Sequence, residues 1–186
     1  MTDVAADDAP SADGAVGFGH KPIIVVMGVS GSGKTTIEEE IAPLLGVPFI
    51  DSDDFHSKAN IAKMTRGEPL TDDDRAPWLE SIGRWLGDHR RSGAVTACSA
   101  LRARYRDEIR RHAPDVLFVH LHGDRQVVTS RIAARPGHFM PTGLVDSQYD
   151  TLEELKPTEN GIVVDFSLPV SQIVDRVVEH IKRSAR

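Results

Sequence analysis

Short apolar runs alternate with segments of helical periodicity along most of the chain. The runs that predict strands are Ile23 to Met27, Val47 to Ile50, Ala94 to Cys98, Val116 to Leu121 and Ile162 to Phe166. Alternation of strand and helix is typical of a parallel sheet whose crossover helices cover both faces. The pattern therefore predicts an α/β fold of three layers around a central parallel sheet of about five strands.

Two of the predicted helices have a clear amphipathic pattern. The last, Val170 to Ile181, has apolar residues three and four positions apart, which places them on one face that can pack on the sheet. Another carries N-cap and first-turn acids at Thr71 to Asp74 and runs to about Arg91. Trp78 and Trp85 fall on its apolar face, so both are predicted to lie in the core.

The first twenty residues break this pattern, because they combine Asp, Ala, Gly and Pro with almost no apolar bulk. Such a segment cannot bury enough surface to offset the entropy of ordering. We predict a disordered tail over residues 1–20 and a single domain over residues 21–186, with no internal repeat.

Composition narrows the kinds of partner. The chain has 22 basic and 28 acidic residues, a formal charge of −6, which disfavours broad electrostatic binding to nucleic acid or anionic membrane. Its one cysteine, Cys98, allows no intramolecular disulfide and suits a reducing compartment. The longest apolar stretch, 22–29, is shorter than a membrane span, and the acidic first residues do not resemble a signal peptide. We therefore predict a cytoplasmic protein.

The segment Gly28-Val-Ser-Gly-Ser-Gly-Lys-Thr35 matches the pattern G-x-x-x-x-G-K-[ST] of a P-loop. It directly follows the first predicted strand and opens a helix at Thr36, which are the two conditions of context that make the pattern specific. We include Thr36 among the ATP-binding residues.

Each residue type in this loop suits the binding of a nucleoside triphosphate. Gly31, Ser32 and Gly33 are small enough for consecutive backbone N–H groups to turn inward, at a helix N-terminus whose partial positive charge faces the anion. Lys34 supplies a cation for the outer phosphates and is expected to act in catalysis. Thr35 places a hydroxyl where a bridging Mg²⁺ would bind.

A P-loop fixes the phosphate donor but leaves the acceptor open. The chain has no Asn-Lys-x-Asp segment, which reads guanine in switch GTPases. The strands predicted at 94–98 and 116–121 continue into Ser and His-Gly, where an ATPase motor would carry Asp or Asp-Glu. A kinase for a small metabolite is therefore favoured.

Acidic residues follow the second predicted strand, in the segment Asp51-Ser-Asp53-Asp54-Phe-His56. Ligands of open α/β sheets bind at this carboxyl end of the strands. We assign Asp51 to the Mg²⁺ shell and Asp53 to acceptance of the proton from the substrate hydroxyl. Asp54 is equally well explained by a cap on the next helix, and His56 either by a substrate hydrogen bond or by a loop histidine with its own partners.

Together with these residues, three further segments resemble the bacterial-type gluconate kinase family. They are Asn60-Ile-Ala-Lys63-Met-Thr-Arg-Gly67-Glu-Pro69-Leu70-Thr-Asp-Asp-Asp74-Arg75-Ala-Pro77-Trp78-Leu79, then Cys98-Ser-Ala-Leu101-Arg-Ala-Arg-Tyr105-Arg106-Asp107, then Arg135-x-Gly-His138-Phe139-Met140-Pro141 through Ser147-Gln148-Tyr149-x-Thr-Leu152-Glu153. The similarity runs from about Ile23 to the C-terminal helix, in order and with near-family spacing.

This resemblance implies transfer of the γ-phosphoryl group of ATP to the 6-hydroxyl of D-gluconate, in a nucleoside-monophosphate-kinase-like P-loop fold that is often dimeric. It also implies a short mobile lid at about 135–143. Two positions depart from the family. Arg102 replaces the usual Lys, and a planar fork of donors is not equivalent to a point charge. Tyr149 stands where Phe is common and adds a hydroxyl.

A linear sugar acid needs a cation for its carboxylate and polar side chains for its hydroxyls. Arg75 and Arg106 are the leading candidates for the carboxylate or a phosphate. The second choices are His56, Lys63, Arg102 and Gln148.

Two arginines precede the predicted lid. Arg131 and Arg135 lie four residues apart on a predicted helix, so both can project toward the phosphates, and the Pro136-Gly137 break after them suits a hinge. We expect Arg135 to stabilise the charge that builds on the transferring phosphoryl group. Arg131 is expected on the adenine or α-phosphate side, with an ordinary surface Arg as the alternative. The loop Asp165 to Pro169 is expected to border the adenine.

Two rival hypotheses stay open. A kinase of the same fold acting on shikimate or adenylylsulfate would keep the P-loop and Asp51-x-Asp53, but not the Asp-Arg-x-Pro-Trp-Leu and Cys-Ser-Ala-Leu segments. A nucleotide-dependent switch without metabolite turnover is disfavoured by the lid-like Arg pair. The favoured hypothesis is an ATP- and Mg²⁺-dependent gluconate kinase that forms a homodimer.

Overall fold

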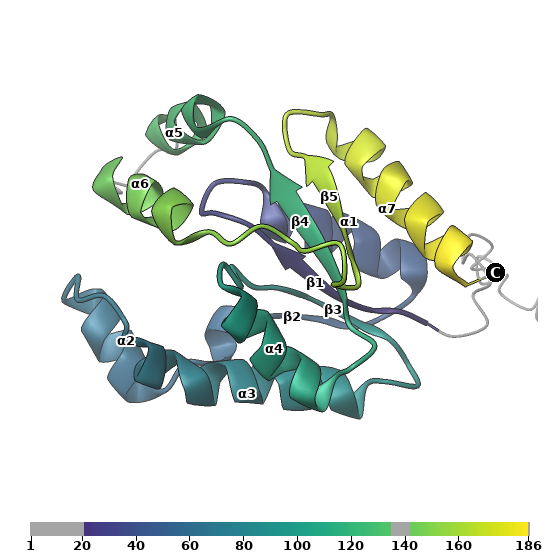
Figure 1. Cartoon of the computed structure of the whole chain (residues 1–186), viewed down its shortest axis with the longest axis horizontal. Coiled ribbons are helices and arrows are strands. Elements are labelled where there is room, and N and C mark those ends of the chain that lie inside the picture. The colour runs from purple at the N-terminus through teal and green to yellow at the C-terminus, as the bar shows by residue number, and fades with distance from the viewer. Residues whose placement is uncertain (1–20, 135–141, 186) are drawn as a thin grey trace, which may run out of the picture.

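The computed structural model describes residues 21–134 and 142–185. Five parallel strands form one sheet in the order β2-β3-β1-β4-β5, with β1 at its centre (Figure 1). The strands are β1 (Ile23–Met27), β2 (Phe49–Asp51), β3 (Ala94–Ala97), β4 (Leu117–His122) and β5 (Gly161–Asp165). The predicted central parallel sheet is confirmed.

Helices cover both faces of the sheet, as the alternating pattern predicts. On one face lie α1 (Lys34–Leu45) and α7 (Val170–Ser184), and on the other α3 (Asp72–Asp88) and α4 (Ala103–His112) (Figure 1). Four further helices gather at the end of the molecule to which the strands point: the 3-10 helix η1 (Ser52–Phe55), α2 (Lys58–Thr65), α5 (Arg125–Ala133) and α6 (Thr142–Thr151).

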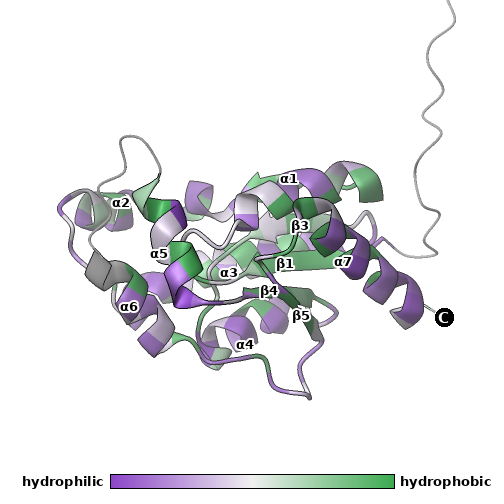
Figure 2. Cartoon of the chain, turned by 90° about the horizontal axis from the view of Figure 1, so that it is seen from above, coloured by the Kyte–Doolittle hydropathy of each residue, from purple (hydrophilic) through white to green (hydrophobic). Residues whose placement is uncertain are grey.

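Alternate residues of β1 face the two helical layers, because side chains along a strand point to opposite faces. Ile24 and Val26 pack with the α1 and α7 layer, whereas Ile23, Val25 and Met27 pack with the α3 and α4 layer. All five are at most 4% exposed. Each such side chain contributes roughly 1.5–3 kcal/mol when fully buried. Figure 2 shows the result, with apolar strands between helices that carry hydrophilic residues on their outer sides.

The structure shifts several predicted boundaries by a few residues. α1 begins at Lys34 rather than Thr36, because Gly33 adopts a left-handed N-cap conformation with φ of 95°. β2 begins at Phe49 and ends on Asp51, so this carboxylate is the last residue of the strand. The predicted cap of α3 is present as a capping box between Thr71 and Asp74.

Two predicted regions fall wholly or partly outside the described residues. These are the tail over 1–20 and the lid, of which residues 142 and 143 belong to α6. Trp78 is buried as predicted, at 5% exposure, and Trp85 packs against the same core cluster while partly exposed. Within residues 21–134 and 142–185, no helix combines the length and apolarity needed to cross a membrane.

Candidate active site

The P-loop turns at three glycines between β1 and α1. Gly28, Gly31 and Gly33 have φ of 143°, 81° and 95°, which favour glycine. A Cβ on Gly28 would also lie 2.7 Å from the carbonyl oxygen of Leu121. The turn delivers the chain to the N-terminus of α1, where the first backbone N–H groups have no helical acceptor and can bind phosphate.

Two side chains of the loop add to this anion site. Lys34 Nζ donates to the carbonyl oxygen of Val29 at 3.1 Å, which folds the ammonium back over the loop. Ser32 is 2% exposed, and its Oγ has no hydrogen-bond partner within the described residues. Because an unpaired buried hydroxyl costs free energy, this orphaned oxygen suits a loop that closes around a bound anion.

A cavity of about 450 Å³ opens on one side of the P-loop, between α5 and the loop before α7. Its loop end is polar, whereas its far end is lined by Phe166, Leu168, Val170 and Ile173. This polarity suits a nucleotide whose base lies away from its phosphates. The loop predicted to border the adenine supplies Phe166 and Leu168 to the wall.

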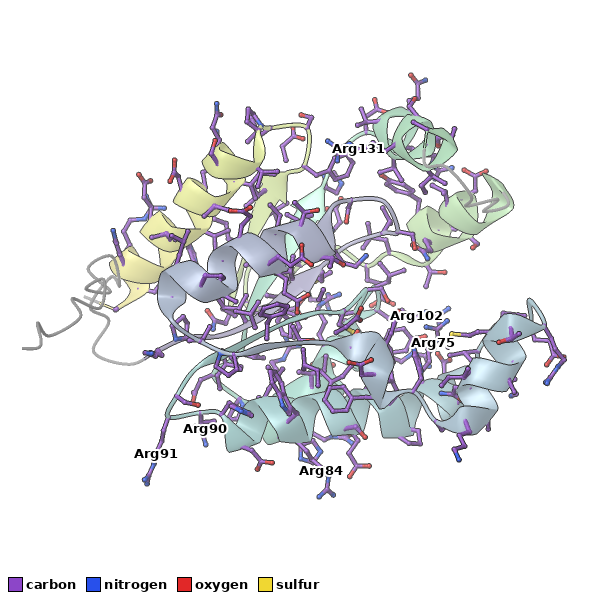
Figure 3. The ribbon with its side chains drawn as sticks, turned by 180° about the vertical axis from the view of Figure 1, so that it is seen from behind. Arg75, Arg84, Arg90, Arg91, Arg102 and Arg131 are labelled. Carbon is purple, nitrogen blue, oxygen red and sulfur yellow. The ribbon has the colours of Figure 1, made fainter. Side chains whose placement is uncertain are left out.

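We name this first cavity the nucleotide cavity, and Arg131 lies at its apolar end. Its Nη2 donates to the carbonyl oxygen of Phe166 at 2.8 Å, and its guanidinium lies 5.3 Å from the centre of the Phe166 ring. Figure 3 shows Arg131 near the ends of α5 and α7, apart from Arg75 and Arg102. These contacts place Arg131 in the wall of this cavity, and its role on the adenine or α-phosphate side stays a prediction. Arg135 falls outside the described residues.

A second cavity of about 320 Å³ lies on the other side of the loop. It shares Gly31, Gly33 and Thr36 with the nucleotide cavity. Its other lining residues include the predicted Lys34, Thr35, Asp51, Asp53 and Gln148, together with Ser30, Ser52, Trp78 and Ser99. A phosphate held in the loop would thus lie between a nucleotide and an acceptor, so we name this space the acceptor cavity.

The two predicted carboxylates have different surroundings in the acceptor cavity. Asp51 Oδ1 accepts a hydrogen bond from the backbone N–H of Asp53 at 2.9 Å and so caps η1. Desolvation at the cavity wall, followed by the neighbouring Asp51 carboxylate, raises the pKa of Asp53, although much of its side chain still opens to solvent. A raised pKa moves a carboxylate toward the range in which it accepts a proton effectively.

His56 stands against the same wall. Its ring stacks on Trp78 with centroids 4.4 Å apart, and its Nε2 lies 3.7 Å from Asp53 Oδ1. Burial lowers the pKa of His56, Asp53 opposes this shift, and Arg75 lowers it further. Trp78, which the sequence places only in the core, also donates from Nε1 to the carbonyl oxygen of Ser52 at 2.7 Å and lines the cavity.

Arg75 and Arg102 supply positive charge on the α3 side of the acceptor cavity. Both guanidinium groups lie 5.9 Å from the centre of the Tyr105 ring, and Arg102 Nη1 lies 3.5 Å from Asp72 Oδ2. Figure 3 shows these two side chains near each other, whereas Arg84, Arg90 and Arg91 project away from the site. Neither is part of the cavity wall itself.

Two predicted acceptor residues are engaged elsewhere. Arg106 is fully buried, and its Nε and Nη2 donate to the two carboxylate oxygens of Glu159 at 2.7 and 2.9 Å. The prediction that Arg106 binds substrate is therefore wrong, because a buried internal partner already holds its charge. Lys63 Nζ donates to both carboxylate oxygens of Asp74 at 2.8 and 2.7 Å, which braces the start of α3 instead of lining the cavity.

Gln148 joins α6 to the P-loop. Its Oε1 accepts from the backbone N–H of Ser30 at 2.6 Å, and its Nε2 donates to Ser30 Oγ at 3.0 Å. The neighbouring Tyr149, which stands where the family commonly has Phe, donates its hydroxyl to the carbonyl oxygen of Gly123 at 3.1 Å. The extra hydroxyl is therefore satisfied within the protein.

The donor set is compatible with Mg²⁺ and ATP. Thr35 and Asp51 present hydroxyl and carboxylate oxygens to one cavity beside Lys34, and oxygen is the ligand type that Mg²⁺ prefers. Among the described residues, no three His, Cys, Asp or Glu side chains gather into a metal cage. One or two protein ligands suffice for an ion that is held mainly by phosphates and water.

Sequence reasoning missed Ser30, Ser99 and Glu38. The first two line the acceptor cavity, and Ser99 accepts from the N–H of Gly28 at 3.3 Å. Ser99 follows a predicted strand on the edge where ligands bind, so its position was an available signal. Glu38 is 1% exposed on α1, and its Oε1 accepts from the N–H of Ala97. The sequence around Glu38 does not indicate that its side chain is buried and bonded to the backbone of Ala97.

The fold and the two cavities define the class of protein, a P-loop kinase whose nucleotide and acceptor spaces meet at one loop. The family model for shikimate kinase matches residues 30–182. The thermoresistant gluconokinase of Escherichia coli is 42% identical over 164 residues, which cover 87% of this chain and 94% of the relative. The chain belongs to the gluconokinase family.

Other comparisons agree. The gluconokinase of Gluconobacter oxydans is 40% identical over 168 residues, covering 89% of this chain and 94% of the relative. The crystal structure of a gluconokinase from Sinorhizobium meliloti has a TM-score of 0.81 at 44% identity and covers 89% and 94% of the two chains. A shikimate kinase from Bacteroides thetaiotaomicron has a TM-score of 0.63 at 17% identity, covering 87% and 98%, so that likeness concerns the fold alone.

Proposed function

We propose that this protein transfers the γ-phosphoryl group of ATP to the 6-hydroxyl of D-gluconate, giving 6-phospho-D-gluconate and ADP. The observation that carries the choice of acceptor is the 40–44% identity to gluconokinases over nearly their whole length. The acceptor cavity supports it, because polar side chains and a carboxylate face a P-loop across a space large enough for a small metabolite.

In this proposal, Asp53 acts as the base. Its carboxylate lines the acceptor cavity next to Lys34, and its raised pKa favours acceptance of the proton that the 6-hydroxyl loses as oxygen attacks phosphorus. Lys34 and the amides at the start of α1 hold the phosphates in line. Arg135 keeps its expected role of stabilising the charge on the transferring group.

Magnesium would be held by Thr35 and Asp51 and would neutralise charge on the phosphates. The carboxylate of gluconate would be met by Arg75 and Arg102, whose forked donors suit a planar anion. His56 and Gln148 are proposed to contact hydroxyls of the sugar acid. We also propose a homodimer that acts in the cytoplasm, on the basis of the family resemblance and the single cysteine.

The test is a panel of acceptors with Mg·ATP and purified protein. Gluconate, other sugar acids, shikimate and adenylylsulfate would be compared with sorbitol, which has the hydroxyls but no carboxylate. ADP release and mass spectrometry of the product identify transfer, and phosphorus NMR locates the phosphate. We expect phosphorylation of gluconate at the 6-position and little transfer to sorbitol.

Two outcomes would contradict the proposal in different ways. Robust transfer to another acceptor but not to gluconate would support a kinase activity and contradict gluconate as the substrate. ATP turnover that no acceptor stimulates would favour the nucleotide-dependent switch.

A further inference from the structure

Arg106 lies at the centre of a buried cluster that the proposed reaction does not use directly. In addition to Glu159, its guanidinium donates to four backbone carbonyl oxygens. These belong to Ala100 at 3.2 Å, Leu101 at 3.5 Å, Glu153 at 3.0 Å and Glu154 at 3.3 Å. Two belong to the loop after β3, and two to the segment after α6. Arg106 therefore ties together two stretches of chain about fifty residues apart in sequence.

The loop after β3 is held in an unfavourable conformation. Ala100 has φ of 43°, and it is the one non-glycine residue with positive φ among those described. A left-handed residue other than glycine is unfavourable and persists only where its surroundings impose it. The Arg106 bond to its carbonyl is part of that constraint. Directly before it, Ser99 lines the acceptor cavity and accepts from the N–H of Gly28.

The segment after α6 reaches the same loop. The backbone N–H of Glu153 donates to the carbonyl oxygen of Leu101 at 2.7 Å, and its Oε2 accepts from the N–H of Ala103 at 2.8 Å. One turn earlier, Gln148 contacts Ser30 of the P-loop. The loop after β3 therefore contacts the P-loop through the backbone of Ser99, and the segment after α6 continues directly from the helix whose Gln148 contacts the P-loop.

We propose that Arg106 and Glu159 form a positioning pair for the acceptor cavity, which fixes the loop carrying Ser99 against the segment that follows α6. The pair acts through these backbone segments and does not touch substrate. This inference rests on the proposed function, since it assumes an acceptor in that cavity. The amides of residues 31–35, which would bind the nucleotide phosphates, take no part in the Arg106 contacts.

The test compares Arg106→Lys with Glu159→Gln in the full chain. A lysine keeps the charge but cannot reach Glu159 and four carbonyls at once. We expect the KM for gluconate to rise and kcat to fall, by about ten- to a hundredfold in kcat/KM, because small displacements of reacting groups cost that much. The Kd of a fluorescent ADP analogue should stay within about twofold, since the phosphate amides are unaffected. Glu159→Gln leaves Arg106 in place. It should also lower kcat/KM for gluconate without changing the Kd of the ADP analogue, but by a smaller factor than Arg106→Lys.

Two control variants on α4 separate positioning from loss of stability. Ile109→Ala removes a fully buried side chain from the same helix and should lower Tm without the split between acceptor and nucleotide. Arg111→Met removes an exposed ion pair with Glu108 and should behave as wild type. An unchanged gluconate KM in Arg106→Lys, or parallel losses of ADP and gluconate binding as Tm falls, would overturn the proposal.

A measurement on the wild type covers the case in which the variants do not fold. Gluconate should slow amide hydrogen exchange in residues 99–103 and 152–155 together, whereas ADP alone should protect residues 28–35. Protection by gluconate of one of the two segments without the other would overturn the positioning pair. If the wild type does not phosphorylate gluconate, the proposed function fails, and the same comparisons then apply with the acceptor that it does phosphorylate.

Discussion

Glu38 is a buried carboxyl on α1 that holds the backbone of Ala97, a residue that lines the acceptor cavity. It lies one turn into α1, is 1% exposed, and accepts a hydrogen bond from the N–H of Ala97 at 2.9 Å. Burial raises the pKa of this carboxyl from 4.5 to about 8, the Ala97 bond opposes the shift, and Asp51 adds to it. At pH 7 Glu38 is therefore neutral in the native protein but ionised in the unfolded chain.

The substitution Glu38→Gln removes this proton and keeps an oxygen that can accept from Ala97. Between the unfolded pKa of 4.5 and the native pKa of about 8, the native state binds one proton more than the unfolded state. In the wild type, the free energy of unfolding therefore falls by about 1.4 kcal/mol for each unit that the pH rises in this range. The loss begins near pH 4.5, is complete above pH 8, and totals about 5 kcal/mol as an upper limit. The advantage of Glu38→Gln should therefore grow up to about pH 8 and then level off.

His120 has the opposite effect at lower pH. It is 1% exposed on β4, its ring nitrogens have no partners within the described residues, and burial lowers its pKa from 6.5 to about 4. Below pH 6.5 the unfolded chain binds the additional proton, so His120 reduces stability as pH falls toward 4. Of these two groups, Glu38 alone changes stability between pH 7 and 8. Because His120 is present in both wild type and Glu38→Gln, its effect cancels in the difference between the two proteins at every pH.

The measurement is urea unfolding at pH 6, 7, 8 and 9, followed by the fluorescence of Trp78 and Trp85. Glu39→Gln, a change at the exposed neighbouring residue, is the matched control. A difference between wild type and Glu38→Gln that stays constant from pH 6 to 8, or that Glu39→Gln reproduces, would refute the buried neutral carboxyl.

Three other substitutions test the site. Asp53→Asn should keep the Kd for ATP and lower kcat on the order of 10²-fold, because loss of a positioned base typically costs that much, and a wild-type kcat would remove Asp53 from the mechanism. Gly28→Ala should reduce the free energy of unfolding by at least about 1–3 kcal/mol, because it combines φ of 143° with a Cβ 2.7 Å from the Leu121 carbonyl; an unchanged urea midpoint would contradict that. Arg131→Met should raise the KM for ATP several-fold with the gluconate KM unchanged, and equal changes in both would place Arg131 elsewhere.

The parts of this protein that sequence predicts well are those in which local chemistry determines the backbone. The glycines at 28, 31 and 33 adopt positive φ, and the helix after them begins within two residues of its predicted start. The apolar runs become strands in one parallel sheet because their burial on both faces requires helices on both sides. In each case the information lies in a short stretch of residues.

The error at Arg106 has the opposite origin. The residue lies three positions before Ile109, so helical spacing alone puts both on one buried face, and that signal was present in the sequence. What made a buried guanidinium tolerable was Glu159, which the chain brings to it from 53 residues away. Arg75 and Arg102 have the same side chain, but neither has such a bidentate buried partner in the part of the chain that the structure describes. The tertiary partner, and not the residue type, decides which arginine is left to meet a substrate.

Gln148 shows how a structural role and a substrate role can share one side chain. A carboxamide has two N–H donors and an acceptor oxygen. Ser30 uses the oxygen through its backbone N–H and one donor through its hydroxyl. Within the described residues, one N–H of Gln148 is then left over, on a side chain that lines the acceptor cavity. The contact that fixes α6 to the P-loop therefore also fixes the direction of this donor, so in the proposed function the packing of α6 on the P-loop and the hydrogen bond to a sugar hydroxyl would depend on the same amide.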